Sequence, residues 1–159
     1  MDMQIKRLPM EALSELLMLQ LASDGTARLS VTGYSMMPML RDRKDSVALR
    51  KAEGLLKKGD IIFYRRENGS FVLHRIIRLK DGGYICCGDN QAETEPVSQE
   101  QVLAVVTGYF RQEKQRSLKN PAYLLYKALW VGLFPLRKYY IRIRRRLGKW
   151  RRDRKAERS

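Results

Sequence analysis

The chain has 159 residues, of which 44% are hydrophobic and 31% charged, and its formal net charge is +15. This length suits one domain with its own hydrophobic core, and the balance of apolar and charged residues excludes a disordered chain. The charge is uneven, because residues 137–159 carry twelve Lys or Arg against two acidic residues, which leaves a net +5 for residues 1–136.

The first 25 residues are predicted to form a short N-terminal helix. Pro9 suits a helix start, residues 11–20 follow as the helix, and Asp24-Gly25 end it. We expect Leu13, Leu16, Leu17 and Gln20 to share one face. The opening residues do not read as a secretory signal peptide, and no run of about 20 apolar residues follows. We therefore expect no N-terminal transmembrane anchor.

Residues 26–116 switch to the pattern of short strands separated by turns. Asn68-Gly69, between two apolar runs, predicts a hairpin. The expected strands are Ala27–Thr32, Ser46–Lys51, Asp60–Arg65, Phe71–Leu79, Tyr84–Cys87 and Val102–Phe110. Many short strands with closely spaced turns predict a mainly β, mostly antiparallel core, with a distorted barrel as its form.

The adjacent Cys86 and Cys87 give no sign of a metal site or a disulfide. Neighbours on a strand point to opposite faces, and two Cys with one His make a poor metal site. We interpret both as packing residues and expect no metal and no cofactor.

Residues 117–159 form a basic, amphipathic tail that is predicted to be helical. Asn120-Pro121 suits a helix start, and Pro135 interrupts the apolar segment that follows. Anionic lipid head groups and nucleic-acid phosphates both attract such a tail. We favour peripheral attachment to an anionic membrane surface, because no nucleic-acid-binding motif accompanies the charge. The alternative is that residues 123–133 cover the β core while the Arg run is solvated.

Three windows could carry chemistry. In the first, Ser35 follows Gly33 and precedes Met36, Met37 and a proline. A serine nucleophile needs an exposed, constrained turn beside backbone N–H groups, and a glycine lets a substrate backbone approach closely. The methionines would supply apolar walls. An ordinary turn explains this window equally well when it is taken alone.

In the second window, His74 shares a strand face with Val72 and Ile76. An imidazole against an apolar wall stays neutral near pH 7, as a general base must. The plainer interpretation is a core histidine bonded to a carbonyl.

In the third window, Asp89 lies between Gly88 and Asn90 after a strand. It is either a turn former or the acid that orients an imidazole.

Taken together and in order, these windows resemble the boxes of the type I signal peptidase superfamily. The family shows Ser-Met-x-Pro-x-Leu, a Gly-Asp-Ile-Val-type strand, a base followed by Arg and two aliphatic residues, and a final Gly-Asp-Asn. Here the corresponding segments are 35–40, 59–65, 74–77 and 88–90, within a resemblance that covers residues 31–106. The base is followed by Arg75, as in the Ser-His subtype of the endoplasmic reticulum and archaea, whereas bacterial signal peptidases and LexA-type autopeptidases carry Lys.

The resemblance implies a serine endopeptidase that cleaves leader or signal peptides, usually after small residues. Ser35 would be the nucleophile and His74 the base, while Gly33, Met36 and Met37 would form the oxyanion and substrate-binding region. Asp89 is our first choice for the orienting acid and Glu95 the second, because the further Asp of the Ser-His subtype is missing. Gly33 stands where many relatives have a Ser, so the oxyanion contacts would come from the backbone.

Two other functions fit the same residues. One is a self-cleaving regulatory peptidase, with the basic tail binding nucleic acid; no helix-turn-helix and no Ala-Gly-type cleavage site support it. The other is an inactive binding module, against which the presence of both Ser35 and His74 argues.

Overall fold

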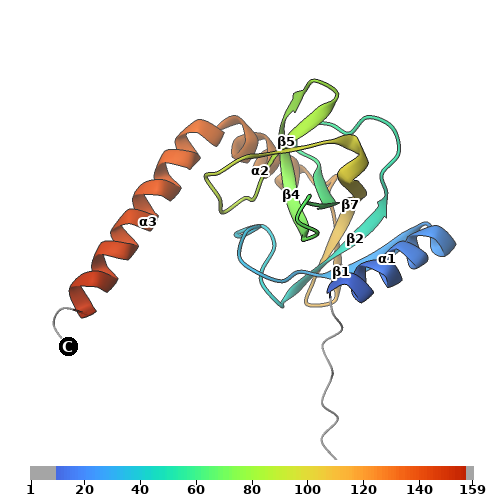
Figure 1. Ribbon diagram of the computed structural model, residues 1–159, viewed down its shortest axis with the longest axis horizontal. Helices are drawn as coiled ribbons and strands as arrows, with labels where there is room; N and C mark the ends of the chain where they lie inside the picture. Colours follow the sequence, from blue (N-terminus) through green and yellow to red (C-terminus); the bar gives the residue numbers. More distant parts are fainter. Residues whose placement is uncertain (1–9, 157–159) are drawn as a thin grey trace, which may run out of the picture.

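The computed structural model of the chain describes residues 10–156, which form a mainly antiparallel β-sheet with helices at both ends of the sequence (Figure 1). The elements are α1 (Met10–Asp24), β1 (Thr26–Ser30), β2 (Asp45–Lys51), β3 (Ile61–Arg65), β4 (Phe71–Lys80), β5 (Gly83–Cys87), β6 (Glu95–Val97), a 3-10 turn (Gln99–Gln101), β7 (Val102–Arg111), β8 (Lys114–Ser117), α2 (Pro121–Gly132) and α3 (Phe134–Ala156). The predicted fold class, a β core between a short helix and a helical tail, is confirmed.

In the described part of the chain the sheet has eight strands, in the order β1-β2-β7-β3-β4-β5-β6, with β8 paired to β7. Every pairing between described strands is antiparallel. The expected barrel does not close, because β1 and β6 end the path without pairing to each other. The sheet therefore leaves backbone edges that another extended chain could use.

All six predicted strands are present, with small shifts at their ends. Alternation along β3 sorts its side chains between two apolar clusters: Ile61 and Phe63 belong to one, and Ile62 and Tyr64 to the other. The sequence prediction missed β6 and β8. β6 has three residues including Pro96, and every residue of β8 is exposed, so neither shows an alternating pattern.

The predicted apolar face of α1 is correct at Leu17 but wrong at two other positions. Leu16 is 53% exposed and Gln20 is exposed, whereas Leu17 and Leu21, one turn apart, are buried in the core cluster. Apolar residues occur all round this helix, so the contact with β1 and β2 selects which of them are buried. Pro9 and the Leu13 side chain lie outside what the structure describes.

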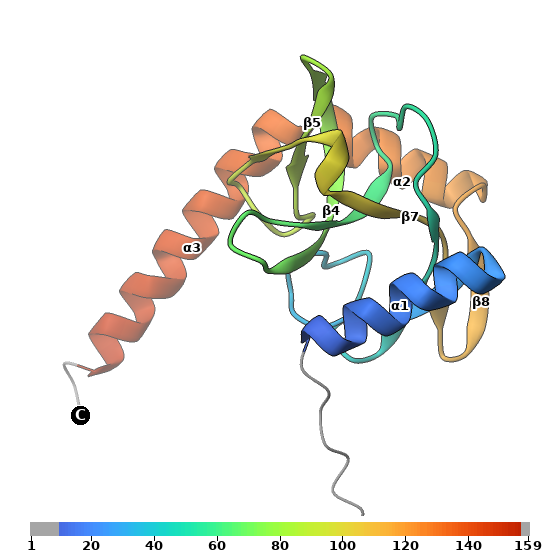
Figure 2. The ribbon, with the colours of Figure 1, turned by 45° about the vertical axis from the view of Figure 1, so that its right-hand side comes forward.

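The C-terminal helices divide the predicted tail into a docked part and a projecting part. Asn120 caps α2 by accepting a 2.9 Å hydrogen bond from the Ala122 N–H, and Pro135 lies in the first turn of α3, after the break. Tyr123, Val131, Arg137 and Ile141 are buried. The rest of α3 extends away from the sheet (Figures 1 and 2). Within residues 10–156, no helix has the length and apolarity that a bilayer crossing requires.

Candidate active site

A cleft of about 460 Å³ lies between two strand edges and contains both Ser35 and His74. Among residues 10–156, β1 pairs only with β2, and residues 71–74 of β4 pair only with β3, since β5 joins β4 from Arg75 onward. The cleft is lined by Arg28, Leu29, Ser30, Val31, Thr32, Ser35, Met36, Phe63, Arg66, Phe71, Val72, Leu73, His74 and Gln91. Strands that lie far apart in the sheet order therefore meet across one cavity.

Ser35 lies in the turn that follows β1 and is partly exposed. Neither its hydroxyl nor its main-chain N–H makes a hydrogen bond with any residue in the described part of the chain. The Ser35 hydroxyl therefore makes no hydrogen bond to His74, although the two residues line the same cleft, and the Ser35 N–H is free to donate to an oxyanion.

His74 is 2% exposed and is held through one ring nitrogen. Its Nδ1 lies 3.0 Å from Glu95 Oε1 and 3.0 Å from the Tyr64 hydroxyl oxygen. Because a carboxylate only accepts hydrogen bonds, we assign the proton to Nδ1, which leaves a lone pair on Nε2. Burial lowers the pKa of His74 more than the Glu95 charge raises it. The imidazole is therefore neutral near pH 7, as a general base must be.

Glu95, at the start of β6, is held by two partners besides His74. Arg66 donates to both carboxylate oxygens at 2.6 Å, and the Tyr64 hydroxyl donates to Oε1 at 2.5 Å. Burial alone would raise the pKa of Glu95, but the hydrogen bonds from Arg66 and Tyr64 outweigh it and the pKa is lowered. Glu95 is thus a carboxylate at neutral pH, positioned to orient His74.

The first-choice orienting acid, Asp89, makes a different contact. Its carboxylate accepts two hydrogen bonds from Arg75, at 2.8 and 2.7 Å, and a third from the Tyr126 hydroxyl at 3.0 Å. Both members of the Arg75–Asp89 ion pair have fully buried side chains. Neighbouring strand residues face opposite ways, so Asp89, bonded to Arg75, lies on the other face of β4 from the His74 ring. The contact to Nδ1 belongs to Glu95, the second choice.

The Gly88–Asn90 turn instead holds the Ser35 segment. The Asn90 N–H donates a 2.7 Å hydrogen bond to the Ser35 carbonyl, and the Asn90 side chain donates to the Tyr34 carbonyl at 3.2 Å. A Cβ at Gly88 would lie 2.6 Å from the Ser35 carbonyl oxygen, so only glycine permits this approach. Through Asp89 and Arg75, the same turn is tied to the strand that carries His74.

Of the three residues predicted to form the oxyanion and substrate-binding region, one lines the cleft and two do not. Met36 is buried and lines the cleft. Gly33 and Met37 do not line it, and the Gly33 N–H donates to Asp42 Oδ1 at 2.8 Å. Gly33 has φ +86°, a backbone conformation that favours glycine. Its role at this position is to turn the chain, and its N–H is not free to meet an oxyanion.

Sequence reasoning missed Tyr64 and Arg66. A signal for Tyr64 existed, because the Asn68-Gly69 hairpin pairs Ile62 with His74 and Tyr64 with Val72. This register places Tyr64 diagonally beside His74 on the same face. Arg66 lies at the end of that hairpin and has no sequence signal, since its partner Glu95 comes from a strand that was not predicted.

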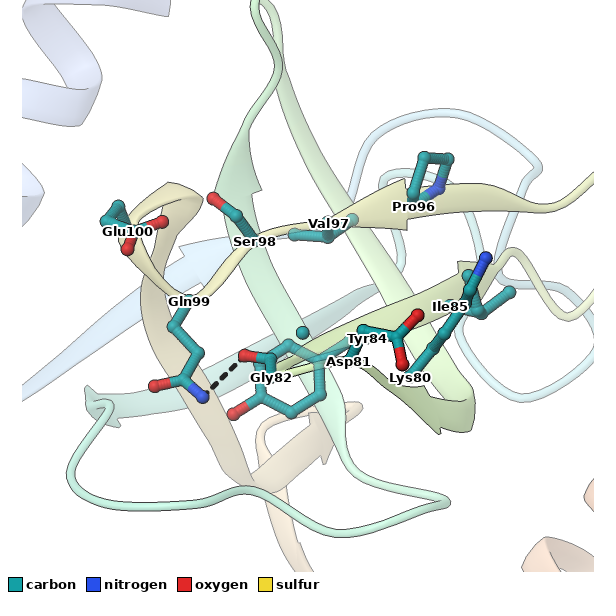
Figure 3. Close-up of a pocket in the computed structure, with 11 residues that line it drawn as sticks. Lys80, Asp81, Gly82, Tyr84, Ile85, Pro96, Val97, Ser98, Gln99 and Glu100 are labelled. Carbon is teal, nitrogen blue, oxygen red and sulfur yellow. Dashed lines mark hydrogen bonds between the residues drawn. The ribbon is translucent and has the colours of Figure 1, made fainter.

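A second hollow, of about 500 Å³, lies between the β4–β5 hairpin and the segment that contains β6 (Figure 3). Its lining includes Ser98 but no histidine, and Gln99 Nε2 donates to the Gly82 carbonyl at 2.6 Å across it. Its charged residues are Lys80, Asp81 and Glu100, so it has no imidazole that could act as a neutral base for Ser98.

In comparisons with known proteins, no family model matches the chain, and no curated protein gives a significant match.

Proposed function

We propose that the chain is a serine endopeptidase of the signal-peptidase type, with Ser35 as nucleophile, His74 as general base and Glu95 as the residue that orients His74. One observation carries the proposal: Ser35 and His74 line one cleft, and Glu95 holds the imidazole through Nδ1. Acyl transfer on unrelated folds uses these three kinds of group, a nucleophile, a base and an orienting acid.

The chemistry follows from the assigned tautomer. Nε2 of His74 takes the proton of the Ser35 hydroxyl as its oxygen attacks a peptide carbonyl. The N–H of Ser35 donates to the oxyanion that forms, and Glu95 stabilises the imidazolium. His74 then returns the proton to the leaving amine, which produces an acyl-enzyme and the released C-terminal fragment. Water, activated by the same imidazole, completes the hydrolysis.

An extended peptide is the substrate form that the cleft accommodates. The free edge of β1 and the free edge of residues 71–74 offer unpaired backbone groups on two sides of the cavity, and a bound peptide would add to them as a strand. Leu29, Val31, Met36, Phe63 and Phe71 supply apolar walls. We therefore propose a leader or signal peptide with an apolar stretch before the scissile bond.

The exposed face of α3 supports peripheral attachment to an anionic membrane. Its exposed apolar and aromatic side chains recur at helical spacing, and the intervening exposed positions are mostly Lys or Arg. These exposed apolar residues are Leu136, Tyr139, Tyr140, Ile143, Leu147 and Trp150. An apolar stripe bordered by cations is the pattern of an interfacial helix.

The test is incubation with a panel of leader peptides, followed by mass spectrometry of the products. The wild-type protein should cleave at least one peptide at a single bond, and Ser35→Ala should abolish that cleavage while far-UV circular dichroism stays unchanged. Cleavage that persists undiminished in Ser35→Ala would remove Ser35 from the mechanism.

A further inference from the structure

The helix α3 contacts the turn that holds Ser35, although α3 lies outside the cleft. Arg137 donates to the carbonyls of Gly88 and Asp89, and Arg144 donates to Asn90 Oδ1 at 2.7 Å. Arg145 adds contacts to the carbonyl of Asn90, at 3.4 Å, and to the Glu93 carboxylate, at 2.9 Å. Over little more than two turns of one helix, three arginines thus bind one loop.

The loop passes this contact on to the nucleophile. Asn90 receives Arg144 on its side-chain oxygen and donates from its side-chain nitrogen to the Tyr34 carbonyl, at 3.2 Å. Its main-chain N–H donates to the Ser35 carbonyl at 2.7 Å. Both the oxygen and the nitrogen of the Asn90 side-chain amide are therefore hydrogen-bonded. Asn90 alone connects Arg144 of α3 to the Tyr34–Ser35 backbone.

Arg137 is an unusual group to place at this point. It is 8% exposed, forms no salt bridge with any residue between 10 and 156, and its Nε has no hydrogen-bond partner there. It is held instead by backbone carbonyls and by the Trp130 and Phe134 rings, at 5.3 and 5.0 Å. Trp130 Nε1 also donates to the Asp89 carbonyl, at 3.1 Å. Burying a cation without an acidic partner is costly for stability alone.

We propose that Arg137 and Arg144 are positioning residues for Ser35, so that docking of α3 sets the geometry of the nucleophile. The catalytic meaning of this coupling rests on the proposed peptidase function, whereas the physical coupling of α3 to the Ser35 turn does not. Displacement of a nucleophile by a fraction of an ångström lowers the rate of the chemical step more than it weakens substrate binding.

The experiment compares Arg144→Ala, Arg144→Lys and Arg137→Lys with the matched control Arg146→Ala, in the full chain and without lipid. Arg146 is exposed on the same helix and makes no hydrogen bond or ion pair with any residue in the described part of the chain. Two readouts are taken: amide hydrogen exchange of residues 33–40 and 88–91, and kcat and KM on a cleaved leader peptide.

Arg144→Ala should speed exchange in both segments and lower kcat by about 2- to 10-fold with little change in KM, as the loss of one exposed charged hydrogen bond predicts. Arg144→Lys should restore part of the loss, because an ammonium can also donate to Asn90. Arg137→Lys should lower kcat by about tenfold or more, since one ammonium does not reproduce the guanidinium contacts. Arg146→Ala should match the wild type.

Wild-type exchange and wild-type kcat in Arg144→Ala and Arg137→Lys would overturn the proposal. If Arg137→Lys fails to fold, Arg144→Ala decides alone, because its side chain is exposed. Altered exchange together with no Ser35-dependent cleavage by the wild type would support the coupling and refute the peptidase function, so the two failures are distinguishable.

Discussion

Glu95 Oε1 lies 3.0 Å from Nδ1 of His74, and the same oxygen accepts hydrogen bonds from the Tyr64 hydroxyl and from one Arg66 nitrogen. An imidazole held in this way presents Nε2 as its free, basic nitrogen. The acid that matters to the proposed reaction is thus on a three-residue strand, β6, outside the Gly-Asp-Asn box.

Glu95→Gln is expected to lower kcat by about 10²- to 10⁴-fold, because an amide allows the wrong imidazole tautomer and does not stabilise the imidazolium. Steady-state kinetics on a cleaved leader peptide measure the loss. A change of only a few-fold would mean that Glu95 does not orient the base.

Asp89→Asn is the matched comparison and should act on stability first. It removes the charge that compensates the fully buried Arg75, and breaking a buried pair costs about 3–5 kcal/mol. Urea denaturation should show that the free energy of unfolding falls by this amount in Asp89→Asn. It should fall much less in Glu95→Gln, because the Glu95 side chain is 26% exposed. Equal losses would contradict the separate roles given to the two acids.

The pH dependence follows from the lowered pKa of His74. Catalysis needs the neutral imidazole, so kcat/KM should stay on its plateau below pH 6.5, the ordinary value, and fall only beneath the lowered pKa. Between these two values the unfolded chain binds more protons than the folded one, so stability should also fall as the pH drops through this window. A kinetic pKa above 6.5 would contradict the assigned environment.

The sequence was most informative where side-chain alternation and turn residues agree. His74 between Val72 and Ile76, and the Asn68-Gly69 turn, predict β4 and its hairpin with β3, because both features are local. The sequence identifies the Gly88–Asn90 box but does not predict that this turn holds Ser35. The Ser35–Asn90 contact joins residues that only the folded sheet brings together. The strand edges that form the cleft also result from the order of strands in the sheet, which local sequence patterns do not give.

Glu95 could not be preferred over Asp89 by sequence reasoning. Its strand contains Pro96 and has no alternating pattern, so neither β6 nor its pairing with β5 was predicted. The apolar residues of α1 are distributed too evenly to indicate a face, which explains the error at Leu16 and Gln20. In the tail, Tyr123 is buried and its hydroxyl accepts a 3.0 Å hydrogen bond from Arg75, a contact that no spacing rule gives.

Because α2 is part of the core, membrane attachment should be tested by substitution and not by deletion of the tail. Arg142 and Lys149 are exposed on α3. Replacing both with Ala should weaken binding to vesicles that contain phosphatidylserine by about 30-fold, at roughly 1 kcal/mol for each cation. Sedimentation with these vesicles measures the change, and neutral phosphatidylcholine vesicles are the control. Equal binding by the wild type and the double variant would refute an electrostatic anchor.

The most direct test of the account is the rate at which a fluorophosphonate modifies Ser35, followed by intact-mass and peptide mass spectrometry. The reagent reports the reactivity of the hydroxyl without any choice of peptide substrate. We predict a single adduct on Ser35 in the wild-type protein, with a rate reduced by orders of magnitude in His74→Ala and clearly reduced in Glu95→Gln. Modification of another residue, or an equal rate in the wild type and His74→Ala, would contradict the pairing of Ser35 with His74.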